Sequence, residues 1–115
     1  MVDLVFTMTC PACGEAYDAT IGGEYVGRVR LRYGYLVARD VDEVELLRCD
    51  VSSDRLFGCF YPDIDMRDAY LTLAAEAIAA AADCEGPVFV SVENYHDYEG
   101  DFDFDSGWLA PRGPN

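Results

Sequence analysis

The chain has 115 residues, of which 22 are acidic and eight are arginine, with no lysine, so its formal net charge is −14. A chain this acidic repels polyanions, which makes nucleic acid and anionic membranes unfavourable as direct partners. Its length, its 51% hydrophobic content and the lack of an apolar run of about 18 residues predict one folded domain over 1–109 and a loose tail over 110–115.

The first half of the chain is predicted to form only β-strands. Short apolar runs rich in β-branched and aromatic residues indicate strands, and glycine and aspartate mark the turns between them. Residues 24–40 alternate in polarity, and Gly34 is expected to bend this strand before the chain continues extended. The predicted strands cover residues 2–8, 17–21, 24–40, 41–49 and 56–61.

Helical spacing replaces this alternation after residue 63 and predicts one long helix over about 64–84. Asp63 or Asp65 can cap its N-terminus, and a Gly-Pro pair follows its C-terminus. Apolar residues form two neighbouring stripes that cover most of the helix circumference, and its alanines permit close packing on a sheet. Leu73 and Ile78 are both expected to be buried against that sheet.

The chain after the helix is predicted to return to strands at 87–95 and 101–105, joined by a hairpin turn. Aspartates alternate with phenylalanines in 101–105, so Phe102 and Phe104 are expected to face the core while the aspartates face solvent on an edge strand. This order of elements predicts an α+β fold, in which a largely antiparallel sheet carries one helix (about 64–84) packed on one face.

A Cys-Pro-Ala-Cys-Gly motif spans residues 10–14. Two thiolates three residues apart, followed by a glycine, allow backbone N–H groups to point at both sulfurs. The motif resembles one half of a zinc ribbon or of a rubredoxin-type knuckle, which implies Cys10 and Cys13 as zinc ligands, with Cys49 and Cys59 as candidates for the remaining positions. The alternative is a pair of ordinary thiols, so the prediction leaves open either zinc or no cofactor.

The strand that runs into Cys10 and Cys13 also resembles the active-site entry of a glutaredoxin, which implies dithiol redox chemistry. That fold needs a long helix after the second cysteine, whereas residues 14–23 contain β-formers and end in Gly-Gly. Five cysteines, an odd number, without a recognisable signal peptide instead predict reduced thiols and a cytoplasmic location.

Three arginines, Arg28, Arg30 and Arg32, share one face of the predicted strand 24–40. Neighbours on such a face are about 6.8 Å apart, so these side chains could form an anion-binding or phosphate-binding patch. Pairing with Glu43 and Glu45 on a neighbouring strand is the simpler structural interpretation.

Acidic residues are concentrated in the C-terminal half, where residues 58–115 hold twelve acids and two arginines. Concentration favours a surface that docks on a basic partner, whereas adaptation to salt would spread the acids more evenly. The aspartates of 101–105 also imitate the start of an EF-hand calcium loop, with the glycine one position late. Trp108 is either a recognition anchor or a side chain that closes the core. The predicted partner-binding residues are Glu93, Asp97, Glu99, Asp101, Asp103, Asp105 and Trp108.

No nucleophile–base or acid–base pair can be assigned, and His96 is the only histidine, so the sequence does not predict an enzyme. In size and charge the chain resembles phage-encoded anti-CRISPR and anti-restriction proteins. This resemblance implies a nucleic-acid mimic or inhibitor that docks its acidic C-terminal surface on the basic, nucleic-acid-binding site of a partner protein. The alternative hypothesis is a zinc-knuckle adaptor of a housekeeping complex.

Overall fold

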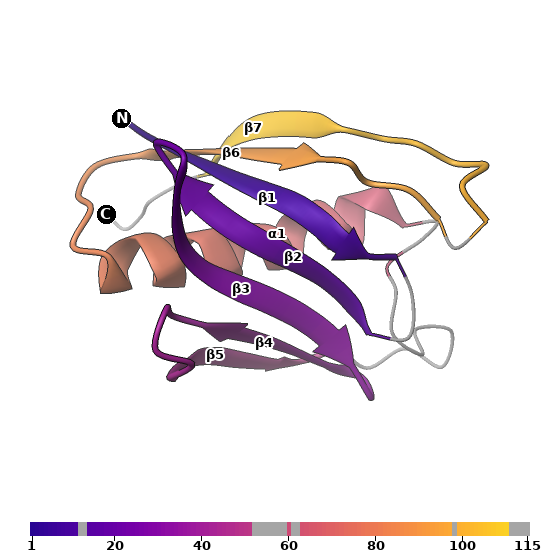
Figure 1. The fold of residues 1–115 in the computed structure, drawn as a ribbon, viewed down its shortest axis with the longest axis horizontal. Coiled ribbons are helices and arrows are strands. Elements are labelled where there is room, and N and C mark those ends of the chain that lie inside the picture. The colour runs from indigo at the N-terminus through magenta and orange to yellow at the C-terminus, as the bar shows by residue number, and fades with distance from the viewer. Residues whose placement is uncertain (12–13, 52–59, 61–62, 98, 111–115) are drawn as a thin grey trace.

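Seven strands and one helix make up the residues that the computed structural model describes, which are 1–11, 14–51, 60, 63–97 and 99–110 (Figure 1). The fold is therefore a mixed α+β fold with a single helix, as the sequence predicts. The elements are β1 (Val2–Cys10), β2 (Glu15–Ile21), β3 (Glu24–Arg32), β4 (Tyr35–Arg39), β5 (Glu45–Asp50), α1 (Ile64–Ala81), β6 (Val88–Glu93) and β7 (Ser106–Ala110).

The strands form one sheet in the order β5-β4-β3-β2-β1-β6-β7. Neighbouring strands are antiparallel except for β1 and β6, which are parallel. Strands β1 to β5 follow one another across the sheet in chain order, and the chain then leaves the sheet at its β5 edge. A parallel neighbour requires a crossover connection, and α1 provides it by carrying the chain back across the sheet to the far side of β1.

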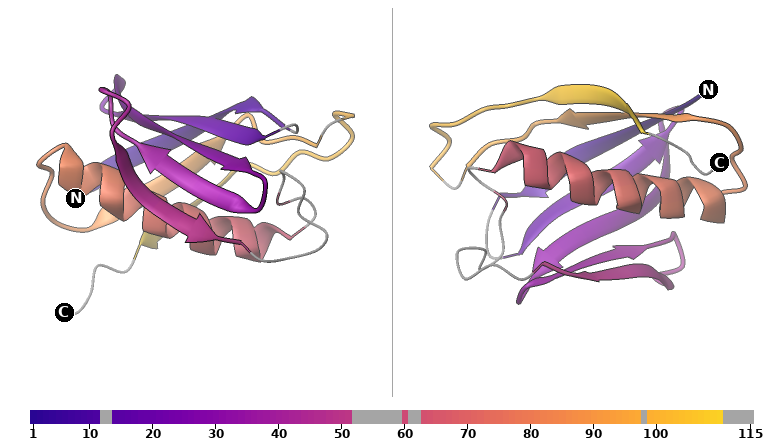
Figure 2. Two further views of the ribbon diagram at one scale, coloured as in Figure 1. Left: turned by 90° about the horizontal axis from the view of Figure 1, so that it is seen from below. Right: turned by 180° about the vertical axis from the view of Figure 1, so that it is seen from behind.

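The sheet curls around α1, which lies across β1, β3, β4, β5 and β6 (Figure 2). The core fills the space between the helix and the sheet, because alternate residues of each strand point toward α1. Leu4, Phe6 and Met8 of β1 are buried there, and so are Val88, Val90 and Val92 of β6. Within the described residues, no helix combines the length and the apolar character that crossing a membrane requires.

The helix begins where the sequence predicts, and it ends at Ala81, before the predicted end at residue 84. Asp63 is the N-cap, and its side chain accepts a hydrogen bond of 2.9 Å from the backbone N–H of Met66. This bond satisfies one of the backbone donors that the first turn of a helix leaves unpaired.

The predicted orientation of the helix is wrong at Leu73, whose exposed fraction is 46%, whereas Ile78 is fully buried as expected. The two neighbouring apolar stripes explain the error, since periodicity alone does not decide which of them faces the sheet. The stripe that faces the sheet contains a charged residue, Arg67. Its other buried members are Leu71, Ala74, Ala75, Ile78 and Ala79.

Residues 24–40 form a hairpin and not the single bent strand that was predicted. Arg32 pairs with Tyr35, so Tyr33 and Gly34 make a two-residue loop in which φ is 55° and 78°, respectively. Positive φ at both positions is characteristic of the type I′ turn, whose twist matches that of the flanking strands. The reversal brings the outer face of β4 beside the arginines of β3. The predicted strand 56–61 lies outside the described residues except for Phe60, which is buried and not in a strand.

The prediction of an edge strand at 101–105 is also wrong. These residues form a loop with one isolated bridge between His96 and Asp103, and the edge strand is β7, whose last residue, Ala110, extends into the predicted tail. Phe102 and Phe104 do not alternate with the aspartates between core and solvent. Their rings stack on each other, with centroids 6.4 Å apart and planes 17° apart, and Phe104 remains 44% exposed.

Replacing one leucine in each helix stripe tests the observed orientation. Leu71→Ala should lower the free energy of unfolding by about 2–5 kcal/mol, because it leaves a cavity between α1 and the sheet. Leu73→Ala, the matched control two residues further along the helix, should change it by about 0.5 kcal/mol or less, because Leu73 is partly exposed. Urea denaturation of both variants measures the difference. Equal losses would contradict this orientation of the helix.

Candidate functional site

The six acids predicted to bind a partner lie in one segment, residues 93–105, called here the acidic segment. It connects β6 to β7 and extends beyond the ends of both strands at one end of the molecule (Figure 1). All of these acids are exposed except Asp97, which is half-buried. The structure therefore brings the predicted residues together. Glu93 ends β6, and the other five lie on the loop that follows, including the three aspartates that were predicted to lie on a strand.

Two of the six carboxylates hold the loop in shape. Asp97 Oδ1 accepts hydrogen bonds from the backbone N–H groups of Asp101 (2.8 Å) and Phe102 (3.1 Å). Asp105 Oδ1 accepts one from the N–H of Tyr95 at 3.0 Å. These side-chain-to-backbone bonds add to two backbone hydrogen bonds across the loop, from Asp97 N–H to Phe102 O (3.0 Å) and from Phe104 N–H to Tyr95 O (3.3 Å).

The other four carboxylates face solvent without a partner. Within the described part of the chain, their side chains make no hydrogen bond or ion pair. They are Glu93, Glu99, Asp101 and Asp103. No described basic side chain forms an ion pair with them, so a basic surface of another protein would lower their mutual repulsion.

A buried arginine that the sequence analysis missed anchors the acidic segment from below. Arg67 of α1 is fully buried, and its Nη1 donates a hydrogen bond of 2.9 Å to the backbone carbonyl of Phe104. Its Nη2 also donates to the hydroxyl of Ser106, and its guanidinium carbon lies 4.5 Å from the centre of the Tyr95 ring. Asp68 balances the charge, because its Oδ1 accepts from Nε at 2.9 Å and from Nη2 at 2.7 Å.

The side chain of Trp108 contacts the helix and the core, and it is only partly available to a partner. Its indole N–H donates a hydrogen bond of 2.7 Å to the hydroxyl of Thr72 on α1, and the half-buried ring packs against the core. Of the two interpretations of this residue, the structural one fits the geometry better.

The cysteines predicted as zinc ligands are only partly described. Cys10 ends β1 and Cys49 lies in β5, so β2, β3 and β4 separate them in the sheet, while Cys13 and Cys59 lie outside the described residues. Burial raises the pKa of the Cys49 thiol, which disfavours the thiolate that a metal needs. No group of three His, Cys, Asp or Glu residues suited to a metal ion occurs among the described residues. A zinc site that includes Cys13 stays a prediction.

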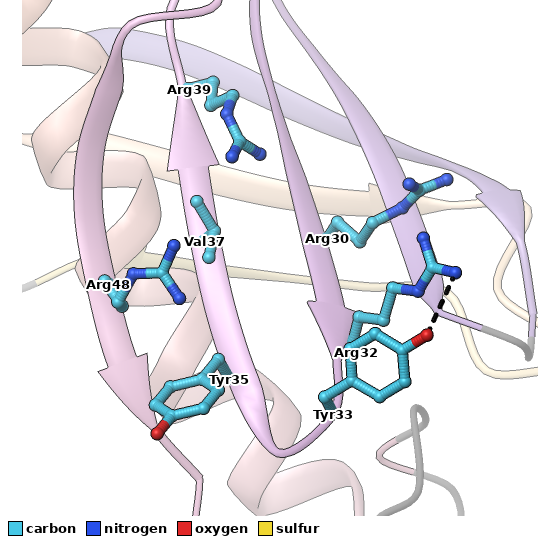
Figure 3. A pocket seen from close by; sticks show the side chains of 7 residues that line it. All are labelled: Arg30, Arg32, Tyr33, Tyr35, Val37, Arg39 and Arg48. Carbon is cyan, nitrogen blue, oxygen red and sulfur yellow. Dashed lines mark hydrogen bonds between the residues drawn. The ribbon is translucent and has the colours of Figure 1, made fainter.

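The predicted pairing of the β3 arginines is confirmed at one position. Arg28 forms an ion pair of 3.0 Å with Glu43, whereas Glu45 pairs with Arg48 of its own strand at 2.9 Å. Arg30 and Arg32 have no ion pair with a described residue. Both line a hollow of about 380 Å³ on the outer face of β3, β4 and β5, called here the arginine pocket (Figure 3). It is lined by Arg30, Arg32, Tyr33, Tyr35, Val37, Arg39 and Arg48.

A buried carboxylic acid, Glu15, lies in the core and was also missed. Its Oε2 accepts a hydrogen bond from the Tyr17 hydroxyl, and its Oε1 accepts one from the Phe60 N–H at 2.9 Å. Burial raises the pKa of Glu15 from 4.5 to about 7 and outweighs these hydrogen bonds and the charge of Arg67, which lower it. The carboxyl is therefore partly protonated near neutral pH.

No protein-family model, curated protein or solved structure matches this chain. The assignment of a function consequently depends on the residues and the geometry described above.

The raised pKa of Glu15 predicts how stability changes with pH. Above pH 4.5 the unfolded chain releases this proton, while the folded protein keeps it up to about pH 7. The contribution of Glu15 to the free energy of unfolding is therefore complete below pH 4.5, and it declines as the pH rises through 7. Glu15→Gln should remove a decline of up to about 3 kcal/mol, at 1.36 kcal/mol for each unit of pKa. Urea denaturation between pH 5 and 8 measures it, with Glu24→Gln as a control for the lost charge. Parallel profiles for wild type and Glu15→Gln would contradict the assignment.

Proposed function

We propose that this protein is a small, non-enzymatic, cytoplasmic binding protein that docks its acidic segment on a basic surface of a partner protein. The observation that carries the proposal is the set of four exposed carboxylates without a described partner, Glu93, Glu99, Asp101 and Asp103. The described backbone around them accepts a hydrogen bond from the side chain of Arg67 and donates hydrogen bonds to those of Asp97 and Asp105.

Order in the backbone distinguishes this segment from a merely solubilising one. Acids that serve solubility or salt adaptation need no defined geometry, and a disordered loop would expose them equally well. Here the carboxylate of Asp97 accepts hydrogen bonds from two backbone N–H groups of the segment. The buried side chain of Arg67 donates a hydrogen bond to a backbone carbonyl of the same segment. A preorganised set of charges loses less conformational entropy on binding, which favours affinity for a complementary surface.

The partner that fits such a surface is a protein with a basic groove. Grooves of this kind bind nucleic-acid phosphates through arginine and lysine. We therefore propose competition with nucleic acid, as an inhibitor or nucleic-acid mimic of the anti-CRISPR or anti-restriction type. Direct binding of nucleic acid is unfavourable for a chain with a net charge of −14.

Neutralising three of the exposed acids tests the proposal. The triple variant Glu99→Gln, Asp101→Asn, Asp103→Asn keeps Asp97 and Asp105 and should fold like the wild type. A matched variant with the same change in charge, Glu24→Gln, Asp42→Asn, Glu85→Gln, alters exposed acids outside the segment. The measurement is the displacement of labelled duplex DNA from a Cas9–guide RNA complex and from a restriction endonuclease.

The wild type and the matched variant should displace the DNA from at least one of these enzymes, and the triple variant should be weaker by a factor of about ten or more. Displacement should also fall steeply from low to physiological salt, because exposed charges are screened. A triple variant as effective as the wild type, or a wild type that displaces DNA from neither enzyme, would contradict the proposal.

A further inference from the structure

We propose that the arginine pocket binds a small phosphorylated ligand that carries an aromatic ring, as a nucleoside triphosphate does. The pocket lies on the outer face of the sheet, toward its β5 edge, whereas the acidic segment joins the two strands at the opposite edge. This inference goes beyond the proposed docking function and is independent of it.

The register of three strands assembles the pocket. Val37 of β4 lies between Arg30 of β3 and Arg48 of β5, its direct neighbours across the strands. Arg39 follows on the same face of β4, and Figure 3 shows Arg39 and Arg48 flanking Val37. Directly opposed side chains are about 5 Å apart, so the cationic groups surround a small apolar floor.

The balance of charge in the pocket is opposite to that of the chain. Four of the eight arginines line it, in a protein with 22 acidic residues. Only Arg48 has an ion-pair partner among the described residues, namely Glu45. Arg30, Arg32 and Arg39 form no ion pair with a described residue, although Glu45 lies opposite Arg39 on β5. A bound anion would relieve the repulsion among these three arginines.

Aromatic rings orient two of the guanidinium groups. Arg32 lies 4.9 Å from the ring centre of Tyr33 and donates a hydrogen bond of 3.3 Å to its hydroxyl, and Arg48 lies 5.4 Å from the ring centre of Tyr35. Contact with a ring holds a guanidinium plane in place, and its remaining N–H groups stay available for the paired hydrogen bonds that phosphate accepts.

Tyr33 occupies a position that local stability does not explain. It lies in a type I′ turn at φ 55°, where asparagine, aspartate and glycine are favoured and a bulky side chain is uncommon. Its side chain is also 78% exposed, so it gains little from burial in the core. A strained, exposed ring at the edge of a cationic pocket is well placed to stack on a ligand.

Size and charge narrow the class of ligand. The hollow of about 380 Å³ falls within the range of pockets for small molecules. Three arginines without a described ion pair suit a compact, multiply charged anion, and phosphate accepts bidentate hydrogen bonds from guanidinium groups. A long polyanion would also meet the negative remainder of the surface, so a small ligand is favoured over DNA or RNA.

Isothermal titration calorimetry at low salt tests the site, with adenosine triphosphate and inorganic triphosphate as probes. The wild type should bind one adenosine triphosphate per chain. Arg30→Gln should weaken binding by a factor of about ten, as expected for the loss of a charge-assisted hydrogen bond. Arg28→Gln is the matched control, because Arg28 lies on the same face of the same strand but pairs with Glu43 outside the pocket. It should leave the affinity within a factor of about two.

A second variant, Tyr33→Asn, tests the role of the ring. It should raise the thermal midpoint, since asparagine suits the turn. It should weaken binding of adenosine triphosphate more than that of inorganic triphosphate, because only the first ligand has a ring to stack on Tyr33 while both lose the orientation of Arg32. The proposal is overturned if the wild type binds neither probe, if Arg28→Gln weakens binding as much as Arg30→Gln, or if Tyr33→Asn leaves the affinity for adenosine triphosphate unchanged. A DNA oligonucleotide that binds more tightly than adenosine triphosphate would overturn the choice of a small ligand.

Discussion

The buried guanidinium of Arg67 is the constraint on which the C-terminal half of this fold depends. Removing a charged group from water costs several kcal/mol, and this cost is offset only where good partners replace the water. Here the partners are Asp68, the carbonyl of Phe104, the hydroxyl of Ser106 and the face of Tyr95. Three of these four residues belong to the acidic segment or to β7, so one cation on α1 positions the chain between β6 and β7.

The same arrangement separates the charges of the molecule. Arginines gather on the outer face of β3, β4 and β5, and exposed carboxylates gather on the loop between β6 and β7, at the other edge of the sheet. Strands β2 and β1 lie between the two groups in the sheet and keep them apart, so they do not pair with each other within the described residues. Two surfaces of opposite charge result, each suited to a different class of ligand.

The features of the fold that were predicted correctly from the sequence are those that local interactions determine. The start of the helix and its Asp63 cap follow from local hydrogen bonding, and both are confirmed. Leu73 was misplaced because both helix stripes are apolar, and because Arg67 in the other stripe argued against the burial of that stripe, since an arginine is seldom fully buried. The hairpin turn at Tyr33 and Gly34 was not predicted, because a bulky residue such as Tyr33 rarely adopts positive φ. The arginine pocket depends on that hairpin turn, because the turn sets the register between β3 and β4. Local sequence patterns do not reveal which strands pair, so the pocket could not be predicted from them.

Hydrogen exchange in Arg67→Met tests most directly whether the buried cation organises the acidic segment. The backbone amides of Asp101, Phe102 and Tyr95, which are bonded to Asp97 and Asp105, should lose protection, while the amides that pair β1 with β2 should keep it. Arg28→Met, which removes an exposed arginine, should leave both groups unchanged. Undiminished protection of these three amides in Arg67→Met would show that the buried cation does not organise the acidic segment.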